Sequence, residues 1–241
     1  MKIATLNVHS IGGKKIDQLC KIINDEKLDL LCFQEISLRS ATLIQFQLLN
    51  KHKKKFNFKI ANLKGLSVVL FTKYHIKSSK ELKIQIDGIE DRVAIQCSIF
   101  IPSISKTIVV IGTHLDHQDE TIRLKQLEII NTEFRLGKTD VFMGDLNALW
   151  KPDYAEKELT EIQSVRKKNN WESAKFDLLT RLTSWFKFDH VTHRTSRFQT
   201  RIDYILIGKK IRHTVINNNI IPTINQHISD HNMVVQNVSF R

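Results

Sequence analysis

Residues 2–33, KIATLNVHSIGGKKIDQLCKIINDEKLDLLCF, hold two strand patterns with a helix pattern between them. Lys2–Val8 and Leu28–Phe33 are short apolar runs of strand length. Between them, Lys15–Asn24 repeats apolar residues at the spacing of one helical face, and this pattern starts just after Gly and Lys residues. The order strand, helix, strand is typical of an α/β chain.

The rest of the chain repeats these patterns, with more strands than helices. A second helical face covers Ile122–Phe134, and residues 149–199 are the least regular part, for which we predict helix and long loops. Further strand patterns occur at Leu66–Phe71, Val93–Ile101, Thr107–Thr113, Val141–Met143, Ile202–Ile207 and Met233–Phe240. Two mixed sheets packed face to face, with helices outside, fit this pattern best. No linker or repeat divides the chain, so we expect a single domain over residues 1–241.

The composition is that of a chain without a membrane span. The chain has 241 residues, of which 41% are hydrophobic, and this is enough for a core of ordinary size. No stretch approaches the about 18 consecutive apolar residues of a membrane helix, and the N-terminus resembles a strand rather than a signal peptide. Cys20, Cys32 and Cys97 lack the spacing of a zinc or redox motif, so we expect buried free thiols. We expect a monomer in the cytoplasm.

The net charge is strongly positive. Lysine and arginine number 37 against 25 aspartates and glutamates, which gives a formal charge of +12. Such an excess is typical of proteins that meet polyanions, including nucleic acids. The chain is also rich in lysine throughout, so runs such as Lys51–Lys55 and Arg166–Lys168 are equally consistent with solvated surface. The sequence leaves both interpretations open.

Polar residues collect at the ends of the predicted strands. Asn7 ends the first strand, Glu35 follows the second, and His114 ends a later one. The other positions of this kind are Asp145, Asn147, Asp203, Asp230 and His231, of which Asp203 is a carboxylate inside an apolar run. Each alone has a structural explanation, such as a turn or a cap, but ligands of α/β sheets gather at strand ends. Together, these oxygen ligands and imidazoles predict a site for a divalent cation beside a phosphate.

Six short motifs carry these residues in a set order along the chain. They are LNVH (Leu6–His9), LCFQEI (Leu31–Ile36), GTHLD (Gly112–Asp116), GDLNA (Gly144–Ala148), RIDYIL (Arg201–Leu206) and SDH (Ser229–His231). With them the chain resembles the endonuclease/exonuclease/phosphatase superfamily, the deoxyribonuclease I-like metal-dependent phosphohydrolases. The resemblance implies an α/β fold, a four-layer sandwich with two central mixed β-sheets flanked by helices.

The resemblance also implies a metal site and a substrate contact. Glu35 matches the principal metal-binding carboxylate, and Asn7 and Asp230 match residues close to the metal or its water ligands. The metal implied is Mg²⁺ or Mn²⁺. Arg123 and Gln126 match an R-x-x-Q helix face found in many members, and from this match we assign Arg123 to the substrate.

The catalytic residues are implied in the same way. His231 matches the histidine beside the scissile phosphate, and His114 matches a position that contacts the phosphate. Asp145 and Asn147 match the pair that orients or deprotonates the attacking water. Asp203 matches the partner of His231, and because a carboxylate in an apolar strand needs a partner, we predict a hydrogen bond between the two side chains.

Departures from the motifs disfavour several subgroups. Ser37 in QEIS stands where abasic-site endonucleases carry a lysine, and TRIDYI differs from the DRI-type motif of inositol 5-phosphatases. The chain looks more like the group that contains tyrosyl-DNA phosphodiesterases, although Met233 stands where members commonly have proline. Two histidine pairs, His114 with His117 and His190 with His193, lack the sequence context of a zinc site.

The activity implied is that of a divalent-metal-dependent phosphodiesterase, with nucleic acid as the first expected substrate, in a nuclease or DNA-end-processing reaction. One alternative keeps the chemistry but takes a phospholipid or phosphoinositide, so that an anionic lipid head group is the partner. The aromatic and basic residues between Trp150 and Phe198 suit either substrate. A second alternative is a catalytically inactive binding module on the same fold.

Overall fold

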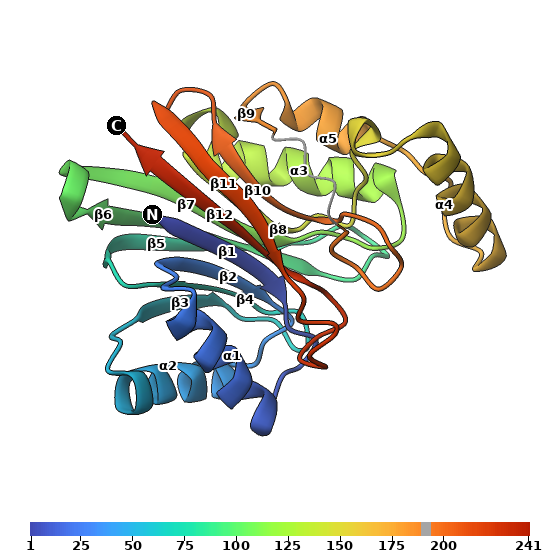
Figure 1. Cartoon of the computed structure of the whole chain (residues 1–241). Coiled ribbons are helices and arrows are strands. Elements are labelled where there is room, and N and C mark those ends of the chain that lie inside the picture. The colour runs from blue at the N-terminus through green and yellow to red at the C-terminus, as the bar shows by residue number, and fades with distance from the viewer. Residues whose placement is uncertain (189–193) are drawn as a thin grey trace.

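Two six-stranded β-sheets packed face to face form the centre of the computed structural model, which describes residues 1–188 and 194–241 (Figure 1). In spatial order, the first sheet holds β11 (His213–Ile221), β12 (Met233–Phe240), β1 (Lys2–Asn7), β2 (Leu30–Gln34), β4 (Val68–Thr72) and β3 (Asn57–Ala61). The second holds β5 (His75–Ile84), β6 (Arg92–Ile101), β7 (Lys106–His114), β8 (Val141–Asp145), β10 (Asp203–Gly208) and β9 (Phe186–Lys187).

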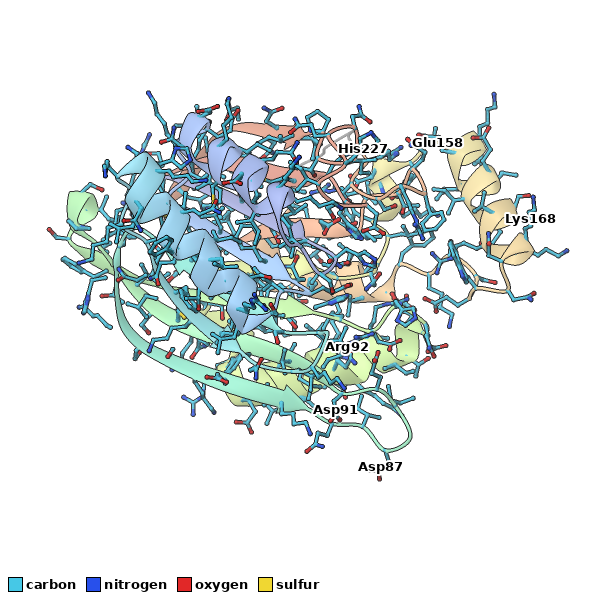
Figure 2. The ribbon with its side chains drawn as sticks, turned by 90° about the horizontal axis from the view of Figure 1, so that it is seen from below. Asp87, Asp91, Arg92, Glu158, Lys168 and His227 are labelled. Atoms are coloured by element: carbon cyan, nitrogen blue, oxygen red, sulfur yellow. The ribbon has the colours of Figure 1, made fainter. Side chains whose placement is uncertain are left out.

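Helices cover the outer faces of both sheets. α1 (Lys14–Asp25) and α2 (Leu38–His52) lie on the first sheet, whereas α3 (Glu120–Phe134) and α5 (Asp177–Leu182) lie on the second (Figure 1). α4 (Glu156–Lys168) projects from the body, as the labelled Glu158 and Lys168 show (Figure 2). The layers run helix, sheet, sheet, helix, so the prediction of a four-layer α/β sandwich with two mixed sheets is confirmed.

Apolar side chains fill the three spaces between these four layers. One cluster joins α1 and α2 to the first sheet, a second lies between the sheets, and a third joins α3 and α5 to the second sheet. All three cysteines are buried free thiols, as predicted, and Cys32 lies in the layer between the sheets. Among the described residues, no helix combines the length and apolar character needed to cross a membrane.

Each sheet has one parallel strand pair, and the two pairs position the site. β1 and β2 are parallel and joined by α1, and β7 and β8 are parallel and joined by α3, whereas the other paired strands are antiparallel. The register pairs Asn7 with Gln34 in the first sheet and His114 with Asp145 in the second. The carboxyl ends of all four strands therefore meet at one edge, where ligands of α/β sheets collect.

The structure adds elements that the sequence patterns did not locate. α2, β3, β5 and β11 were not assigned to any range, and the three strands lie at sheet edges, where few of their residues are fully buried. Exposed edge strands carry weak hydrophobic alternation, and this removes the signal on which strand prediction depends. Asp203 is the first residue of β10 rather than an interior residue of that strand. His190 and His193 lie outside the described residues.

Candidate active site

Three neighbouring strands carry the buried polar residues of the second sheet. The pairing of β7 with β8 sets His114 opposite Asp145, and the pairing of β8 with β10 sets Asp145 opposite Asp203. All three side chains are buried at the carboxyl edge of β7 and β8. Strand register alone therefore brings together residues that lie almost 90 positions apart in the sequence, from His114 to Asp203.

Gly144 allows β8 to approach β7 closely just before Asp145. Its φ of 144° lies in a region that side chains rarely adopt. A Cβ atom at this position would lie 1.9 Å from the carbonyl oxygen of Thr113, which is backbone and has no room to move. The glycine of the GDLN motif is therefore required by the strand geometry that positions Asp145.

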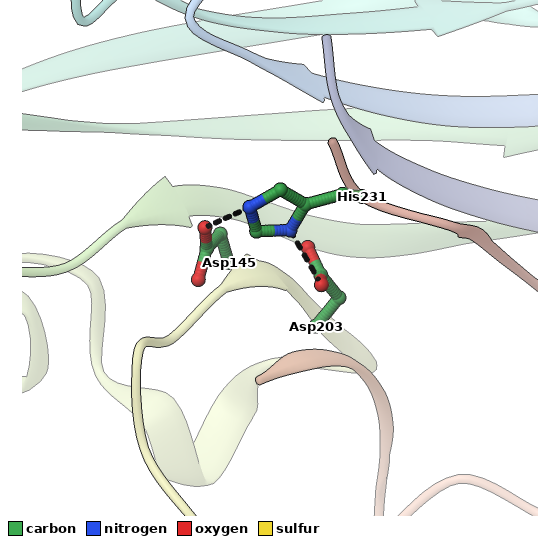
Figure 3. Close-up of side chains that lie close together, drawn as sticks. All are labelled: Asp145, Asp203 and His231. Carbon is green, nitrogen blue, oxygen red and sulfur yellow. Dashed lines mark hydrogen bonds and ion pairs between the residues drawn. The ribbon is translucent and has the colours of Figure 1, made fainter. Parts of the chain in front are cut away.

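His231 lies between two aspartates (Figure 3). Its Nδ1 donates to Asp203 Oδ2 at 2.9 Å, and its Nε2 lies 3.8 Å from Asp145 Oδ2. The Ser229 hydroxyl accepts from the His231 backbone N–H and donates to the carbonyl of Asn7, which ties the SDH motif to the end of β1. The predicted hydrogen bond between Asp203 and His231 is confirmed.

The surroundings of the two histidines shift their pKa values in opposite directions. Burial alone lowers the pKa of His231, but the charge and hydrogen bond of Asp203, together with the charge of Asp145, outweigh it and raise the pKa to about 10. Burial lowers the pKa of His114 to about 4, since Asp145 only partly offsets it. At neutral pH, His231 is therefore a cation that donates from both nitrogens, and His114 is neutral.

The raised pKa of His231 makes the free energy of unfolding depend on pH. Because the folded-state pKa of His231, about 10, exceeds the ordinary value of 6.5, the folded protein binds this proton more tightly. The stabilisation is complete below pH 6.5 and is lost as the pH rises to about 10. We expect the difference in free energy of unfolding between wild type and His231→Gln to shrink over this range in urea titrations with EDTA. A difference of constant size would contradict this assignment.

The first sheet supplies the opposite wall of the site. The Asn7 amide donates from Nδ2 to Glu35 Oε1 at 2.8 Å and to Asp145 Oδ2 at 3.2 Å, and so bridges the two sheets. Glu35 is a non-glycine residue with a φ of 54°, a left-handed conformation that costs about 1–3 kcal/mol. His9 Nδ1 lies 3.2 Å from the other Glu35 oxygen. The backbone turn after β2 thus directs the Glu35 carboxylate toward Asn7 instead of into solvent.

Asn147 closes the site from the loop after β8. It also has a left-handed backbone, with a φ of 49°, and its N–H donates to Asp145 Oδ1 at 3.0 Å. Its side-chain Nδ2 donates to the carbonyl of Leu115 at 3.0 Å and lies 3.3 Å from His114 Nε2. Asn147 therefore fixes its own amide beside the neutral His114 and turns the Asp145 carboxylate toward His231.

Together these residues line one cavity of about 260 Å³, here called the catalytic cleft. Its lining residues are Asn7, Glu35, Leu66, Glu90, Arg92, His114, His117, Asp145, Asn147 and His231. The structure thus places six predicted site residues around one cavity, with Asp203 behind His231. Asp230 lies at the side, where it lines the neighbouring pocket with His231 and faces Arg197 across 3.9 Å.

Arg123 lies elsewhere, which contradicts a direct contact with substrate at the cleft. Its side chain is 2% exposed, its Nε donates to Glu120 at 2.9 Å, and its guanidinium also contacts Glu172 and the carbonyl of Asp116. The Gln126 oxygen accepts from the Asp116 N–H at 2.8 Å. The R-x-x-Q face of α3 therefore braces the loop after β7 from behind, because its polar groups are used inside the protein.

Arg92 is a cleft residue that the sequence analysis missed. It is the buried first residue of β6 (Figure 2), with Nη2 3.1 Å from His117 Nδ1 and 3.7 Å from Asp116 Oδ2. Its Nε has no hydrogen-bond partner among the described residues. The sequence analysis considered polar residues at the ends of strands, whereas Arg92 stands at the beginning of one. β6 runs antiparallel to β7, so the start of one strand lies beside the end of the other, and this pairing is the signal that finds it.

The donor set fits a hard divalent cation. Carboxylate and amide oxygens from Asn7, Glu35 and Asp145 face one cavity, and Asp230 Oδ1 is a buried oxygen without a hydrogen-bond partner among the described residues. The ligand atoms of Asp145, Asp203 and His231 also lie within 4.8 Å of one another. His231 uses Nδ1 on Asp203 and is itself protonated, so the oxygens around Glu35 are the better cation ligands.

The fold and the arrangement of the site residues are those of the DNase I-like class of proteins. The sequence pattern of the Endonuclease/Exonuclease/phosphatase family matches residues 4–231, and the chain belongs to this family. Members of the family are generally metal-dependent phosphoesterases. None of the curated protein sequences matches this chain.

Solved structures agree with the fold at low sequence identity. An endonuclease/exonuclease/phosphatase from Bacteroides vulgatus shares 16% identity over 100% of this chain and 98% of its own, with a TM-score of 0.76. The mannosyl-6-phosphatase Bt3783 of Bacteroides thetaiotaomicron shares 12% over the whole of both chains, with a TM-score of 0.71. The human Nocturnin catalytic domain, solved with a bound sulfate anion, shares 17% over 100% of this chain and 93% of its own, with a TM-score of 0.65.

Proposed function

We propose that this protein is a Mg²⁺- or Mn²⁺-dependent phosphodiesterase that hydrolyses nucleic acid. The observation that carries the proposal is the position of His231, hydrogen-bonded to Asp203 at 2.9 Å and facing Asp145 across the cleft that also holds Glu35. Hydrolysis of a phosphate ester needs an oriented water, neutralisation of the developing charge and help for the leaving oxygen. The cleft has a residue suited to each task.

The charge of each residue in the cleft indicates which of these tasks it performs. His231, a cation held by Asp203, donates a hydrogen bond from Nε2 to a phosphate oxygen, while Arg92 adds positive charge from the other side of the cleft. Burial and the negative charge of Asp203 raise the pKa of Asp145, which makes this carboxylate a better acceptor for the proton of the attacking water. Asn147 orients that water beside Asp145.

Glu35 and Asn7, with Asp230 close by, are the residues that would hold the metal. When bound, a divalent cation supplies positive charge against the phosphate oxygens. The intact arrangement of acid, base and oxygen ligands speaks against an inactive binding module, since a binding role alone needs no buried Asp–His pair.

Glu35→Gln is expected to weaken Mg²⁺ binding at least about tenfold, because Mg²⁺ is held by few protein ligands and this variant removes a charged one. Titration calorimetry of Mg²⁺ into wild type and variant measures the change. Glu26→Gln is a matched control, because Glu26 lies at the end of α1, where it pairs with Lys2. Equal Mg²⁺ affinity of wild type and Glu35→Gln would remove Glu35 from the metal site.

Nucleic acid is favoured as the substrate by charge beside the site. The charge of +12 includes Arg166–Lys168 at the end of α4, and Arg166 lines the pocket next to His231. Lys51–Lys55 contributes little, because α2 starts close to Glu35 and carries this run about 22 Å away along its 15 residues. Lys51 there pairs with Asp17. Of these two runs, the one on α4 is the nearer to the cleft, and this supports a phosphate backbone as its partner.

The substrate class is tested by initial rates on single-stranded DNA, RNA, 5′-tyrosyl DNA, phosphoinositides and sphingomyelin at several salt concentrations. We expect cleavage of a nucleic-acid substrate and an affinity that falls with salt in proportion to the phosphates contacted. Lys167→Gln combined with Lys168→Gln should flatten that dependence, whereas Lys54→Gln combined with Lys55→Gln should not. Cleavage confined to a lipid would refute the nucleic-acid proposal and leave the phosphodiesterase chemistry in place.

A further inference from the structure

A second cavity, of about 490 Å³, opens directly beside the catalytic cleft and shares Asn147 and His231 with it. One wall comes from α4 and the loop that follows it, and the other from residues 196–202. We call it the aromatic pocket, because its main apolar surfaces are Ile162, Val165, Trp171, Phe198 and Ile202. Any phosphate ester held at His231 has one substituent that can enter this pocket.

Two aromatic rings stand at its walls. Trp171 and Phe198 meet edge to face, with ring centroids 4.8 Å apart and planes at 83°, and each residue is still 42% exposed. Neither residue belongs to the core clusters of the described part of the chain. Large half-exposed aromatic surfaces that line a cavity are typical of binding sites, where they offer flat apolar area at little cost in side-chain entropy.

Buried ion pairs hold the Trp171 wall in place. The Arg166 Nε donates to the carbonyl of Glu172 at 2.7 Å, and the Glu172 carboxylate is bound by Arg123 from α3. Arg123 is held in turn by Glu120 at 2.9 Å. Because burying several charges is costly, such a network is weak support for stability by itself. Here it fixes Glu172, and with it the adjacent Trp171, relative to the second sheet, so Arg123 acts as a positioning residue for the pocket.

The polar rim of the pocket indicates a planar and polar occupant. Gln118 and Asn170 line it beside the apolar walls, and an acyl chain would offer their amide groups no hydrogen bonds. The Arg197 guanidinium lies 4.8 Å above the Phe198 ring and is exposed at the mouth, where it adds positive charge next to the scissile position. Flat faces, hydrogen-bonding edges and an adjacent cation match a nucleobase with its phosphate.

We propose that the aromatic pocket binds the nucleobase of one nucleotide next to the scissile phosphate, stacked on Trp171 with Phe198 against its edge, and that this contact sets the substrate preference of the enzyme. The proposal rests on the proposed function, because it assigns one part of that substrate. The expected occupant is a base rather than a lipid tail. The apolar wall that contacts it comes largely from α4 and the loop after it.

The test uses three dinucleotides with one phosphodiester each: thymidylyl-thymidine, and the two versions of it in which one base or the other is replaced by hydrogen. Wild type is expected to cleave thymidylyl-thymidine with a kcat/KM roughly 5- to 100-fold higher than the version that lacks the stacked base. Trp171→Ala should lose most of this preference, mainly through KM, without slowing cleavage of the baseless dinucleotide. Trp171→Phe should keep it. Phe46→Ala is the matched control, because Phe46 is 63% exposed on α2, away from the pocket.

The outcomes separate this proposal from the function on which it rests. Equal wild-type rates on all dinucleotides, or equal slowing of all of them by Trp171→Ala, would overturn the base pocket and leave a phosphodiesterase. No cleavage of any dinucleotide, with cleavage of a lipid ester, would overturn both. If Trp171→Ala fails to fold, as judged by thermal melting, Phe198→Ala in the same assay gives the same comparison.

Discussion

His231→Ala is expected to lower turnover by about 10²–10⁴-fold, the usual contribution of a positioned acid or base. The imidazole touches the reacting phosphate in the proposed mechanism, and the neighbouring His114 cannot replace it as a proton donor, because burial keeps His114 neutral. Steady-state rates on a nucleic-acid substrate, with thermal melting as a check of folding, measure this loss. His213→Ala is a suitable control, because His213 begins the edge strand β11 and faces Ile211.

Asp203→Asn should cost nearly as much, although Asp203 lies behind His231 and acts through its hydrogen bond to that imidazole. Without this carboxylate the pKa of His231 falls, so the alkaline limb of the pH–rate profile should move to lower pH. Residues that act as one unit are non-additive, and the double variant should be little worse than either single one. An unchanged pH profile, or losses that multiply in the double variant, would show that the two residues act independently.

Asp145→Asn is expected to abolish most activity, by about 10²–10⁴-fold, while the melting temperature stays the same or rises. Asp145 is fully buried, and burial together with the nearby negative charge of Asp203 raises its pKa. A neutral amide of the same shape relieves this repulsion, so a carboxylate kept here serves chemistry rather than stability. Rates and calorimetric melting curves of purified variant and wild type measure the two effects.

The same strand offers a matched control for this substitution. Asp140 precedes β8 at its opposite end, where its carboxylate accepts from the Val109 N–H at 2.8 Å and burial raises its pKa. Asp140→Asn makes the same chemical change in a partly buried carboxylate far from the cleft, and it should leave turnover intact. A melting temperature that drops sharply in Asp145→Asn would assign Asp145 a structural role instead.

Much of the site was predictable because its residues follow apolar runs. Asn7, His114 and Asp145 each end a strand whose buried residues give a clear sequence signal. The pairing of Asp203 with His231 was also predictable, since a carboxylate at an apolar strand needs a partner. Two features of the site cannot be read from the sequence pattern. They are the strand register that sets Asp145 between His114 and Asp203, and the left-handed backbone that directs the Glu35 side chain.

Other features had no usable sequence signal. β5 and β11 are edge strands with mostly solvent-facing side chains, so neither shows the alternation that predicts a strand. Arg123 was assigned to the substrate from its match to the R-x-x-Q motif, whereas tertiary packing buries it against Glu120 and Glu172. The aromatic pocket depends on contact between Trp171 and Phe198, which lie 27 positions apart in the sequence, and only the folded structure shows that contact.

The central claim is that the catalytic cleft hydrolyses phosphodiesters with a divalent metal. The most direct test is cleavage of an end-labelled single-stranded DNA oligonucleotide by purified wild type in Mg²⁺ and in EDTA, with His231→Ala at equal concentration to exclude a contaminating nuclease. We expect cleavage by wild type in Mg²⁺, no cleavage in EDTA, and almost none by His231→Ala. Cleavage that persists in EDTA, or at full rate in His231→Ala, would contradict it.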